Sequence, residues 1–185
     1  MEAFIHYISS FDYTLIHLVQ SIGPRWEPVA YFLSHGVGSY PIMLAVFFVA
    51  LLFIDKWRAA AELCIIAIVS YGILMALKHY FGIDRPYIID PALTYYDNET
   101  GFALPSGHAL MSTVILGWVA LRHPKSHTLL WGTITLIVLI GASRVYLGVH
   151  YPSQVVAGWL IGTLIIYLFY SLDKRLWTPF RKKLD

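Results

Sequence analysis

Long apolar runs dominate the pattern of hydrophobic and polar positions along the chain. Five of them approach or reach the roughly 17–25 residues that a helix needs to cross a bilayer. They cover residues 37–54, 59–77, 105–121, 128–143 and 155–172. The only acid or base inside them is Glu62, which lies one turn from the basic end of its run, and we interpret it as structural. The pattern therefore predicts five transmembrane helices.

The first 22 residues have a different pattern. Apolar residues recur at helical spacing from Phe4 to Ile22, and polar residues such as Asp12 interrupt them. This predicts an amphipathic helix that lies along the membrane interface, and a sixth span over residues 3–22 is the alternative. A second interfacial piece is expected at residues 28–33. The stretch has no basic start and no small-residue cleavage site, so we expect no cleaved signal peptide.

Composition favours the same class of protein. Of the 185 residues, 58% are hydrophobic and 13% are charged, about half the charged share of a soluble domain, and the mean hydropathy is +0.63. A net charge of +2 without a clustered basic face excludes a nucleic-acid partner. The single cysteine, Cys64, excludes an intrachain disulfide and any multi-cysteine metal site. We therefore predict an all-α, polytopic membrane helix bundle formed by one domain over residues 1–185. Its parts are interfacial helices (1–36), a transmembrane core (37–172) and a basic cytoplasmic tail (173–185).

The positions of lysine and arginine predict an orientation. If the five spans alternate and residues 55–58 are cytoplasmic, the cytoplasmic segments hold nine of the 13 basic residues, as the positive-inside rule requires. These nine are Lys56, Arg58, Arg122, Lys125, Lys174, Arg175, Arg181, Lys182 and Lys183. The N-terminus is then outside and the C-terminus is cytoplasmic, in what we expect to be a bacterial plasma membrane.

Three of the four basic residues left on the outer side lie at span ends, near histidines and glycines. The stretches are Lys78 to Arg85-Pro86, Pro105-Ser106-Gly107-His108, and Ser143-Arg144 with His150 six residues further on. Cations and the free N–H groups of a helix N-terminus bind a phosphate-like oxyanion. Two histidines provide a nucleophile and a general acid for phosphoryl transfer. Because no carboxylate cluster in these stretches offers a Mg²⁺ site, the residues indicate metal-independent hydrolysis of a phosphate ester.

These stretches resemble the signature of the type 2 phosphatidic acid phosphatase (PAP2) superfamily, which also includes vanadium haloperoxidases. The family pattern is Lys-x6-Arg-Pro, then Pro-Ser-Gly-His, then Ser-Arg-x5-His-x3-Asp. The resemblance implies that His150 attacks phosphorus to form a phosphohistidine, and that His108 protonates the leaving oxygen and then activates water. It also implies that no cofactor is needed and that the phosphate is held by Lys78, Arg85, Ser106, Gly107 and Arg144.

One position departs from the family pattern. The terminal aspartate, which holds the nucleophilic histidine, is Gln154 in this chain. Its side-chain carbonyl can accept a hydrogen bond from His150, but it cannot supply the negative charge that favours an imidazolium. A Ser-Gln pair at this place is similar to the dolichyl-diphosphate phosphatase branch. Slowed or lost catalysis is the alternative.

The first functional hypothesis is an integral membrane lipid phosphate phosphatase with its site on the periplasmic face. The resemblance leaves phosphatidic acid, phosphatidylglycerophosphate, undecaprenyl diphosphate and lipid A open as substrates. A second hypothesis is a non-catalytic phospholipid-binding or transporting protein of the same fold. A third is a vanadate-dependent haloperoxidase, which the lipid-embedded architecture disfavours.

Features outside the motifs receive structural interpretations. The histidines that lack matching partners are expected at the interface; they are His6, His17, His35, His79, His123 and His127. The Gly158-x3-Gly162 pair predicts close helix packing, either within the chain or in a weak homodimer. The loop over residues 88–103 lies between two motifs and is either a lid or head-group selector, or an ordinary solvated loop.

Overall fold

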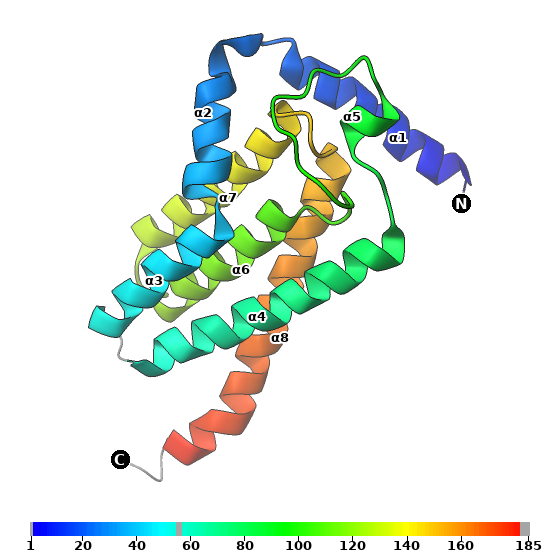
Figure 1. Cartoon of the computed structure of the whole chain (residues 1–185). Coiled ribbons are helices and arrows are strands. Elements are labelled where there is room, and N and C mark those ends of the chain that lie inside the picture. Colours follow the sequence, from blue (N-terminus) through cyan, green and yellow to red (C-terminus); the bar gives the residue numbers. More distant parts are fainter. Residues whose placement is uncertain (1, 55–56, 182–185) are drawn as a thin grey trace.

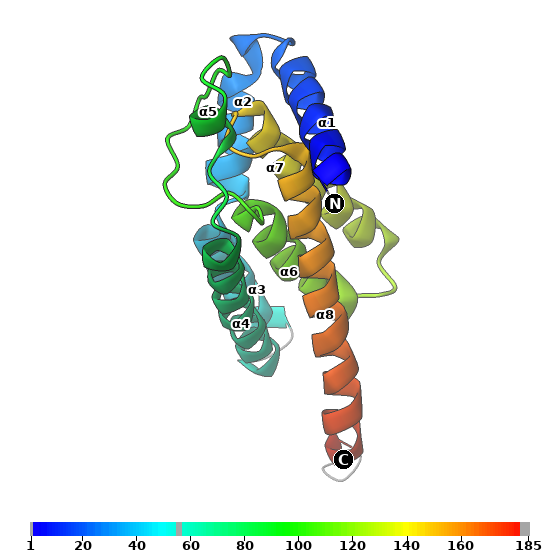
Figure 2. The same cartoon turned by 90° about the vertical axis from the view of Figure 1, so that its right-hand side faces the viewer.

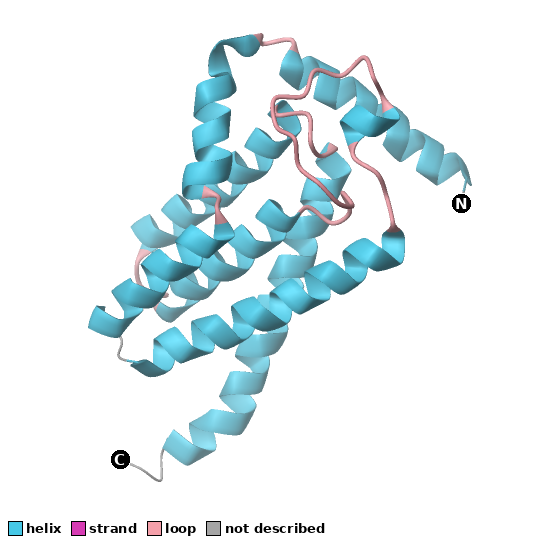
Figure 3. Ribbon diagram, viewed as in Figure 1, coloured by secondary structure: helices cyan, strands magenta, loops and turns pink. Residues whose placement is uncertain are grey.

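The computed structural model describes residues 2–54 and 57–181, with side chains described for 10–53 and 57–172, and every regular element in these ranges is helical (Figure 3). The α-helices are α1 (Glu2–Gln20), α2 (Glu27–Tyr31), α3 (Tyr40–Ile54), α4 (Trp57–Phe81), α5 (Pro86–Ile89), α6 (Gly107–Arg122), α7 (His127–Tyr146) and α8 (Pro152–Arg181). A 3₁₀ turn, Pro24–Trp26, precedes α2, and a π-helical segment, Phe32–Val37, follows it.

Each of the five predicted spans corresponds to a helix, namely α3, α4, α6, α7 or α8. By length and composition, three helical stretches can cross a membrane alone: Trp57–Ile89, His127–Tyr146 and Pro152–Leu172. A fourth span is formed if Pro24–Val37 and Tyr40–Phe53, which meet at a bend of 52°, act together. The all-helical membrane architecture is therefore confirmed for the described residues, whereas five or six spans remain a prediction.

Helix α6 lies at the centre of the bundle, between α3 and α4 on one side and α7 and α8 on the other (Figure 1). All its side chains over residues 107–116 are buried. Leu110 and Ile115 belong to the main core cluster, together with Leu63 and Ile66 of α4. A helix that is apolar on all sides is normally enclosed by protein or lipid. The apolar pattern of α6 therefore reflects contact with its neighbouring helices.

Helix α8 packs closely on α6 through two glycines. A Cβ on Gly158 would lie 2.8 Å from the carbonyl oxygen of Ser106, and a Cβ on Gly162 would lie 2.9 Å from that of Leu110. A side chain at either position would separate the helices. The Gly158-x3-Gly162 pattern thus serves packing within the chain, and the weak homodimer stays a prediction.

Helix α1 lies against the ends of α7 and α8, at the end of the bundle that carries α5 and the α5–α6 loop (Figure 2). Asp12 on α1 accepts hydrogen bonds from the backbone N–H of Ser153 at 2.9 Å and from its hydroxyl. Ile16 packs in a cluster with Val145, while Phe11 on another face is exposed. One face of α1 is thus buried and another is exposed, as in an amphipathic helix. Its position at the membrane interface remains a prediction.

The backbone of the predicted tail, residues 173–185, continues helix α8 as far as Arg181. The side chains that set the predicted orientation include Lys56 and the basic residues of 173–185, and these lie outside the described side chains. His6 lies outside them as well. The predicted orientation of the chain is therefore not tested by the fold.

Candidate functional site

The three motif stretches meet at one end of the bundle, where α1 and the α5–α6 loop also lie. Lys78 is in the last turn of α4 and Arg144 is in the last turn of α7. Arg85 precedes α5, Ser106 is the N-cap of α6, and His150 lies two residues before α8. Each functional side chain therefore comes from a helix end or from a residue next to one.

A cavity of about 600 Å³ opens among these helix ends. Four of the predicted residues line it: Lys78, Arg85, Gly107 and His108. Aromatic side chains of α3 and α4 and the segment 97–102 of the α5–α6 loop complete the lining. The cavity combines cations with an apolar wall, as a binding site for a lipid phosphate requires.

His150 does not line this cavity and is 1% exposed, but it contacts Arg85, which does line it. Its Nε2 is 3.3 Å from Nη1 of Arg85, and its Nδ1 is 3.2 Å from Oε1 of Gln154. The same Oε1 accepts the backbone N–H of Tyr151 at 3.0 Å, which fixes the oxygen end of the amide toward the ring. With Nδ1–H donating to Gln154, the lone pair of His150 is on Nε2. The hydrogen bond expected between Gln154 and His150 is present.

The His150 ring is neutral at neutral pH. Burial, first of all, and then three nearby cations lower its pKa well below the ordinary value; the cations are Arg85, Arg144 and Lys78. Burial and positive neighbours both disfavour the imidazolium. A neutral ring keeps the lone pair that a nucleophile needs.

Arg85 and Arg144 are fully buried cations, with 1% and 0% exposure. Three carbonyl oxygens accept from Arg85, at 3.0 to 3.2 Å; they belong to Gly101, Thr100 and Val149. These hydrogen bonds tie the α5–α6 loop to the segment before α8. The guanidinium of Arg85 is therefore held in one orientation beside His150.

Two buried polar atoms at the site have no hydrogen-bond partner among the described residues. They are the hydroxyl of Ser106 and Nε of Arg144. Buried polar groups in folded proteins are normally paired. The first N–H groups of α6, which follow Ser106, also lack acceptors within the helix. Neither residue lines the cavity, but Ser106 precedes Gly107 and Arg144 pairs with Glu99, and both of these partners line it. Unpaired donors next to the cavity indicate a ligand rich in acceptors, such as a phosphate.

Glu99 of the α5–α6 loop reaches into the same group of side chains. Its Oε2 lies 3.0 Å from Nη2 of Arg85, and its Oε1 pairs with Nη2 of Arg144. Oε1 is also 3.7 Å from Nδ1 of His108. Glu99 is therefore part of the site, whereas the choice between a lid or head-group selector and an ordinary solvated loop stays a prediction.

Glu99 carries a negative charge at this position. Burial by itself would raise the pKa of the carboxyl group, but four neighbouring side chains outweigh it and lower the pKa; they are Arg144, His108, Arg85 and Lys78. Opposite charges at short range stabilise the ionised form of an acid. The loop thus places an anion among the cations of the motifs.

Ser34, His35 and Asp97 also reach the site, although they belong to no motif. The Ser34 hydroxyl accepts from Nη1 of Arg144, and Oδ2 of Asp97 accepts from the same Nη1 at 3.2 Å. Nε2 of His35 is 2.8 Å from Oδ2 of Asp97, and its ring centroid is 6.1 Å from that of His108. His35 therefore has partners at the site, where the π-helical segment places its ring, and its predicted position at the membrane interface stays a prediction.

His35, Asp97 and Glu99 form a cluster of described residues whose ligand atoms all lie within 4.8 Å of one another, as a metal site would require. Both carboxylates already pair with Arg144, and Arg85 lies beside Glu99. A divalent cation would be repelled by these guanidinium groups at short range. We interpret the cluster as an ion-pair network that holds Arg144, and metal independence stays a prediction.

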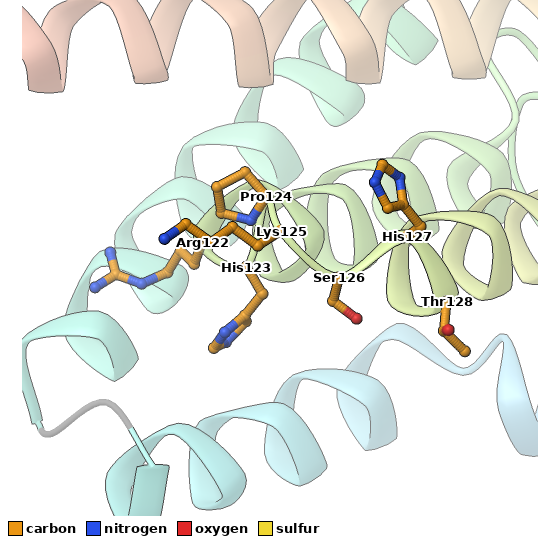
Figure 4. Close-up of a pocket in the computed structure, with 7 residues that line it drawn as sticks. All are labelled: Arg122, His123, Pro124, Lys125, Ser126, His127 and Thr128. Atoms are coloured by element: carbon orange, nitrogen blue, oxygen red, sulfur yellow. The ribbon is translucent and has the colours of Figure 1, made fainter.

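A second hollow, at the opposite end of α6, is lined by residues 122–128 (Figure 4). The rings of His123 and His127 point to opposite sides there, so they do not face a common ligand (Figure 4). Arg122 pairs with Glu62 at 2.6 Å, which confirms the structural interpretation of Glu62. Of the motif histidines, His108 lines the first cavity and His150 lies beside Arg85, which also lines it.

Comparison with known proteins agrees with this geometry. Residues 59–177 match the sequence model of the PAP2 superfamily. The chain belongs to the PAP2 superfamily. This PAP2 chain is 33% identical over 105 residues to the undecaprenyl-diphosphatase of Sulfolobus acidocaldarius, a match that covers 57% of the chain and 47% of that protein. It is 31% identical over 131 residues to phosphatidylglycerophosphatase B of Bacillus subtilis, with 60% and 62% coverage. The chain thus spans about half the length of the curated relatives that it matches.

The PAP2 chain also resembles two solved structures. One is the crystal structure of a transmembrane PAP2 type phosphatidylglycerolphosphate phosphatase from Bacillus subtilis, with a TM-score of 0.77, 21% identity, and coverage of 93% of this chain and 89% of that one. The other is LpxE of Aquifex aeolicus, with a TM-score of 0.69, 23% identity, and coverage of 85% and 93%. At these low sequence identities, the structural similarity shows a shared fold. The PAP2 resemblance predicted from the motifs is confirmed, and the chain is a membrane protein.

Proposed function

We propose that this PAP2 protein is a lipid phosphate phosphatase that hydrolyses a phosphomonoester or diphosphate of a membrane lipid. The observation that carries the proposal is a connected group at one end of the bundle: Arg85 and His108 line the cavity, Arg85 lies beside the buried His150, and Glu99 joins both to the buried Arg144. The printed names of the relatives, undecaprenyl-diphosphatase and phosphatidylglycerophosphatase B, support the substrate class. Phosphatidic acid, phosphatidylglycerophosphate and undecaprenyl diphosphate are the candidate substrates.

In the first step, Nε2 of neutral His150 attacks phosphorus and the bond from phosphorus to the leaving oxygen breaks. Gln154 accepts Nδ1–H of the ring and keeps it in the reactive tautomer. The leaving oxygen takes a proton from His108, which lines the cavity. The product of this step is a phosphohistidine and a lipid alcohol or monophosphate.

In the second step, His108 takes a proton from water, which attacks phosphorus while the phosphorus–nitrogen bond to His150 breaks. Inorganic phosphate leaves and both histidines return to their starting states. Arg85, Arg144 and Lys78 stabilise the negative charge on the transferring group in both steps, together with the Ser106 hydroxyl and the first N–H groups of α6. The reaction therefore needs no metal or cofactor in this proposal.

We further propose that the cavity opens on the periplasmic side of a bacterial plasma membrane and that the C-terminus is cytoplasmic. The charge distribution along the sequence supports this orientation. The exposed apolar surface of the bundle then faces lipid, for example at Ile68 and Leu160, which are 70% and 66% exposed. A lipid tail can stay in the bilayer while its phosphate enters the cavity at the helix ends.

Phosphate release from detergent-solubilised lipids tests the proposal. Wild-type protein should release phosphate from at least one candidate substrate in the presence of EDTA, and His150→Ala should reduce release to background. His127→Ala, which changes a histidine at the opposite end of the bundle, is the matched control and should keep wild-type activity. Equal background release from wild type and His150→Ala on every lipid would favour the non-catalytic alternative.

A further inference from the structure

The Glu99 carboxylate lies where the proposed function requires a phosphate. Its two oxygens contact Arg85 and Arg144, and one of them is 3.7 Å from His108. These are the side chains that would hold the transferring phosphoryl group and protonate the leaving oxygen. A carboxylate and a phosphate present similar pairs of acceptor oxygens to guanidinium groups. Glu99 therefore satisfies, from within the chain, donors that a substrate would also use.

The backbone at Glu99 is fixed, but its side chain has room to turn. The Tyr87 hydroxyl donates to the carbonyl oxygen of Glu99 at 2.6 Å, and Arg85 donates to the carbonyl oxygen of Thr100, the next residue. The Glu99 side chain is 23% exposed and lines the 600 Å³ cavity. Rotation of one side chain, without movement of the loop backbone, can therefore clear the two guanidinium groups.

The charges that remain after such a rotation match a phosphate dianion. Lys78, Arg85 and Arg144 carry three positive charges, and Asp97 stays paired with Arg144 at 3.2 Å. Two positive charges are then left uncompensated, and the buried hydroxyl of Ser106, at the start of α6, has no partner among the described residues. A phosphate with two negative charges neutralises them, whereas a phosphodiester carries only one.

We propose that Glu99 is a built-in occupant of the phosphate pocket that selects terminal phosphates over phosphodiesters. The inference rests on the proposed function. The Glu99 carboxylate and a phosphodiester each carry one negative charge. If a phosphodiester displaces the carboxylate from the arginines, the Coulomb energy of the site therefore changes little. A dianionic terminal phosphate that displaces the carboxylate brings a second negative charge to the arginines and is therefore attracted more strongly. Glu99 is thus a specificity-determining residue that keeps the phosphodiester head groups of bulk phospholipids out of the site.

Binding of orthovanadate, measured by calorimetry on the solubilised full chain, tests the inference without requiring turnover. Glu99→Gln removes the competing charge and should lower the dissociation constant for vanadate by roughly tenfold, the size expected for a charged hydrogen bond. Asp90→Asn is the matched control, because Asp90 is an acid on the same loop that pairs with His17, away from the arginines. It should bind vanadate as wild type does.

Competition by a phosphodiester lipid provides a second readout. Added phosphatidylglycerol should leave phosphate release by wild type nearly unchanged and should inhibit the Glu99→Gln variant several-fold. Equal sensitivity of the two proteins would overturn the inference. If Glu99→Gln is not recovered as a folded protein, Glu99→Ala serves with the same expectations.

The outcomes separate the two proposals. Vanadate binding by wild type together with unchanged or weaker binding by Glu99→Gln would overturn the role of Glu99 and leave the proposed function standing. Absence of vanadate binding by both proteins would overturn the proposed function and, with it, the role of Glu99.

Discussion

Oε1 of Gln154 lies 3.2 Å from Nδ1 of His150, at the position where the PAP2 pattern has an aspartate. The amide oxygen is fixed by a second hydrogen bond, from the backbone N–H of Tyr151. The chain therefore keeps the orienting contact to its histidine but lacks the negative charge that usually accompanies it. Orientation and charge stabilisation, which an aspartate combines, can be separated by substitution at this position.

Gln154→Ala should lower kcat by roughly 10²- to 10⁴-fold, because the ring then loses the partner that fixes its tautomer. Gln154→Asp should raise kcat above wild type, because the carboxylate stabilises the imidazolium that forms in the reaction. Steady-state kinetics on the preferred lipid measures both. A fall in kcat for Gln154→Asp comparable to that of Gln154→Ala would mean that the site depends on the amide itself.

His108→Ala should lower kcat on a lipid phosphate by roughly 10²- to 10⁴-fold, the usual contribution of a general acid. The loss should be much smaller in the pre-steady-state release of p-nitrophenolate from an analogue with that leaving group, because this group departs without protonation and its release precedes the step in which His108 activates water. The comparison of the first-step rates on the two substrates isolates the proton transfer to the leaving group. An equal loss of the first-step rate on both substrates would speak against His108 as the acid.

The pH dependence of kcat/KM follows from the burial of His150. Its pKa lies well below the ordinary histidine value, so the neutral, nucleophilic ring persists as the pH falls through 6.5. We expect the acid limb of kcat/KM in this range to follow the second ionisation of the substrate phosphate, at about pH 6, and to move when the phosphate pKa of the substrate is changed. A limb centred near 6.5 that stays in place when the substrate is changed would show that the nucleophile is not the buried His150 ring.

Asp12→Ala should destabilise the protein and slow the reaction together. The carboxylate accepts two hydrogen bonds from Ser153, which lies between His150 and Gln154 in the sequence. Loss of these bonds should cost about 1–3 kcal/mol of unfolding free energy. Thermal unfolding in detergent, with the exposed Thr14→Ala as control, measures the effect. A melting temperature equal to that of the control would mean that α1 is not anchored through Asp12.

The motif residues could be predicted from sequence because alternating spans bring their ends to the same side. Lys78 ends one span and His108 begins the next, so topology alone places them near each other. The resemblance then assigned roles to residues that periodicity cannot distinguish. The family could be predicted because the three motifs are local in the sequence, and the helical fold could be predicted from the long apolar runs.

Contacts that depend on loop conformation were not predictable. Glu99 reaches the arginines and Asp97 reaches His35 only because the α5–α6 loop folds back over the helix ends. No spacing in the sequence marks a carboxylate in a polar loop as the partner of a buried cation. The contacts of His35 could not be predicted for a related reason, because the orientation of its side chain depends on a π-helical segment.

The number of spans could not be decided from hydropathy. An apolar run has the same pattern whether protein or lipid surrounds it. Helix α6 has 16 residues and is enclosed by its neighbours, and α3 meets the preceding segment at a bend of 52°. Both features depend on packing between helices.

The central claim is that His150 is the nucleophile, and trapping of the intermediate tests it most directly. Wild-type protein mixed with a lipid carrying a radiolabelled phosphate, quenched at alkaline pH within a single turnover and digested, should yield one labelled peptide with the phosphoryl group on His150. The label should be stable in base, lost in acid and absent from His150→Ala. Label on Glu99 or Asp97, or steady turnover by a protein that never becomes labelled, would contradict the account.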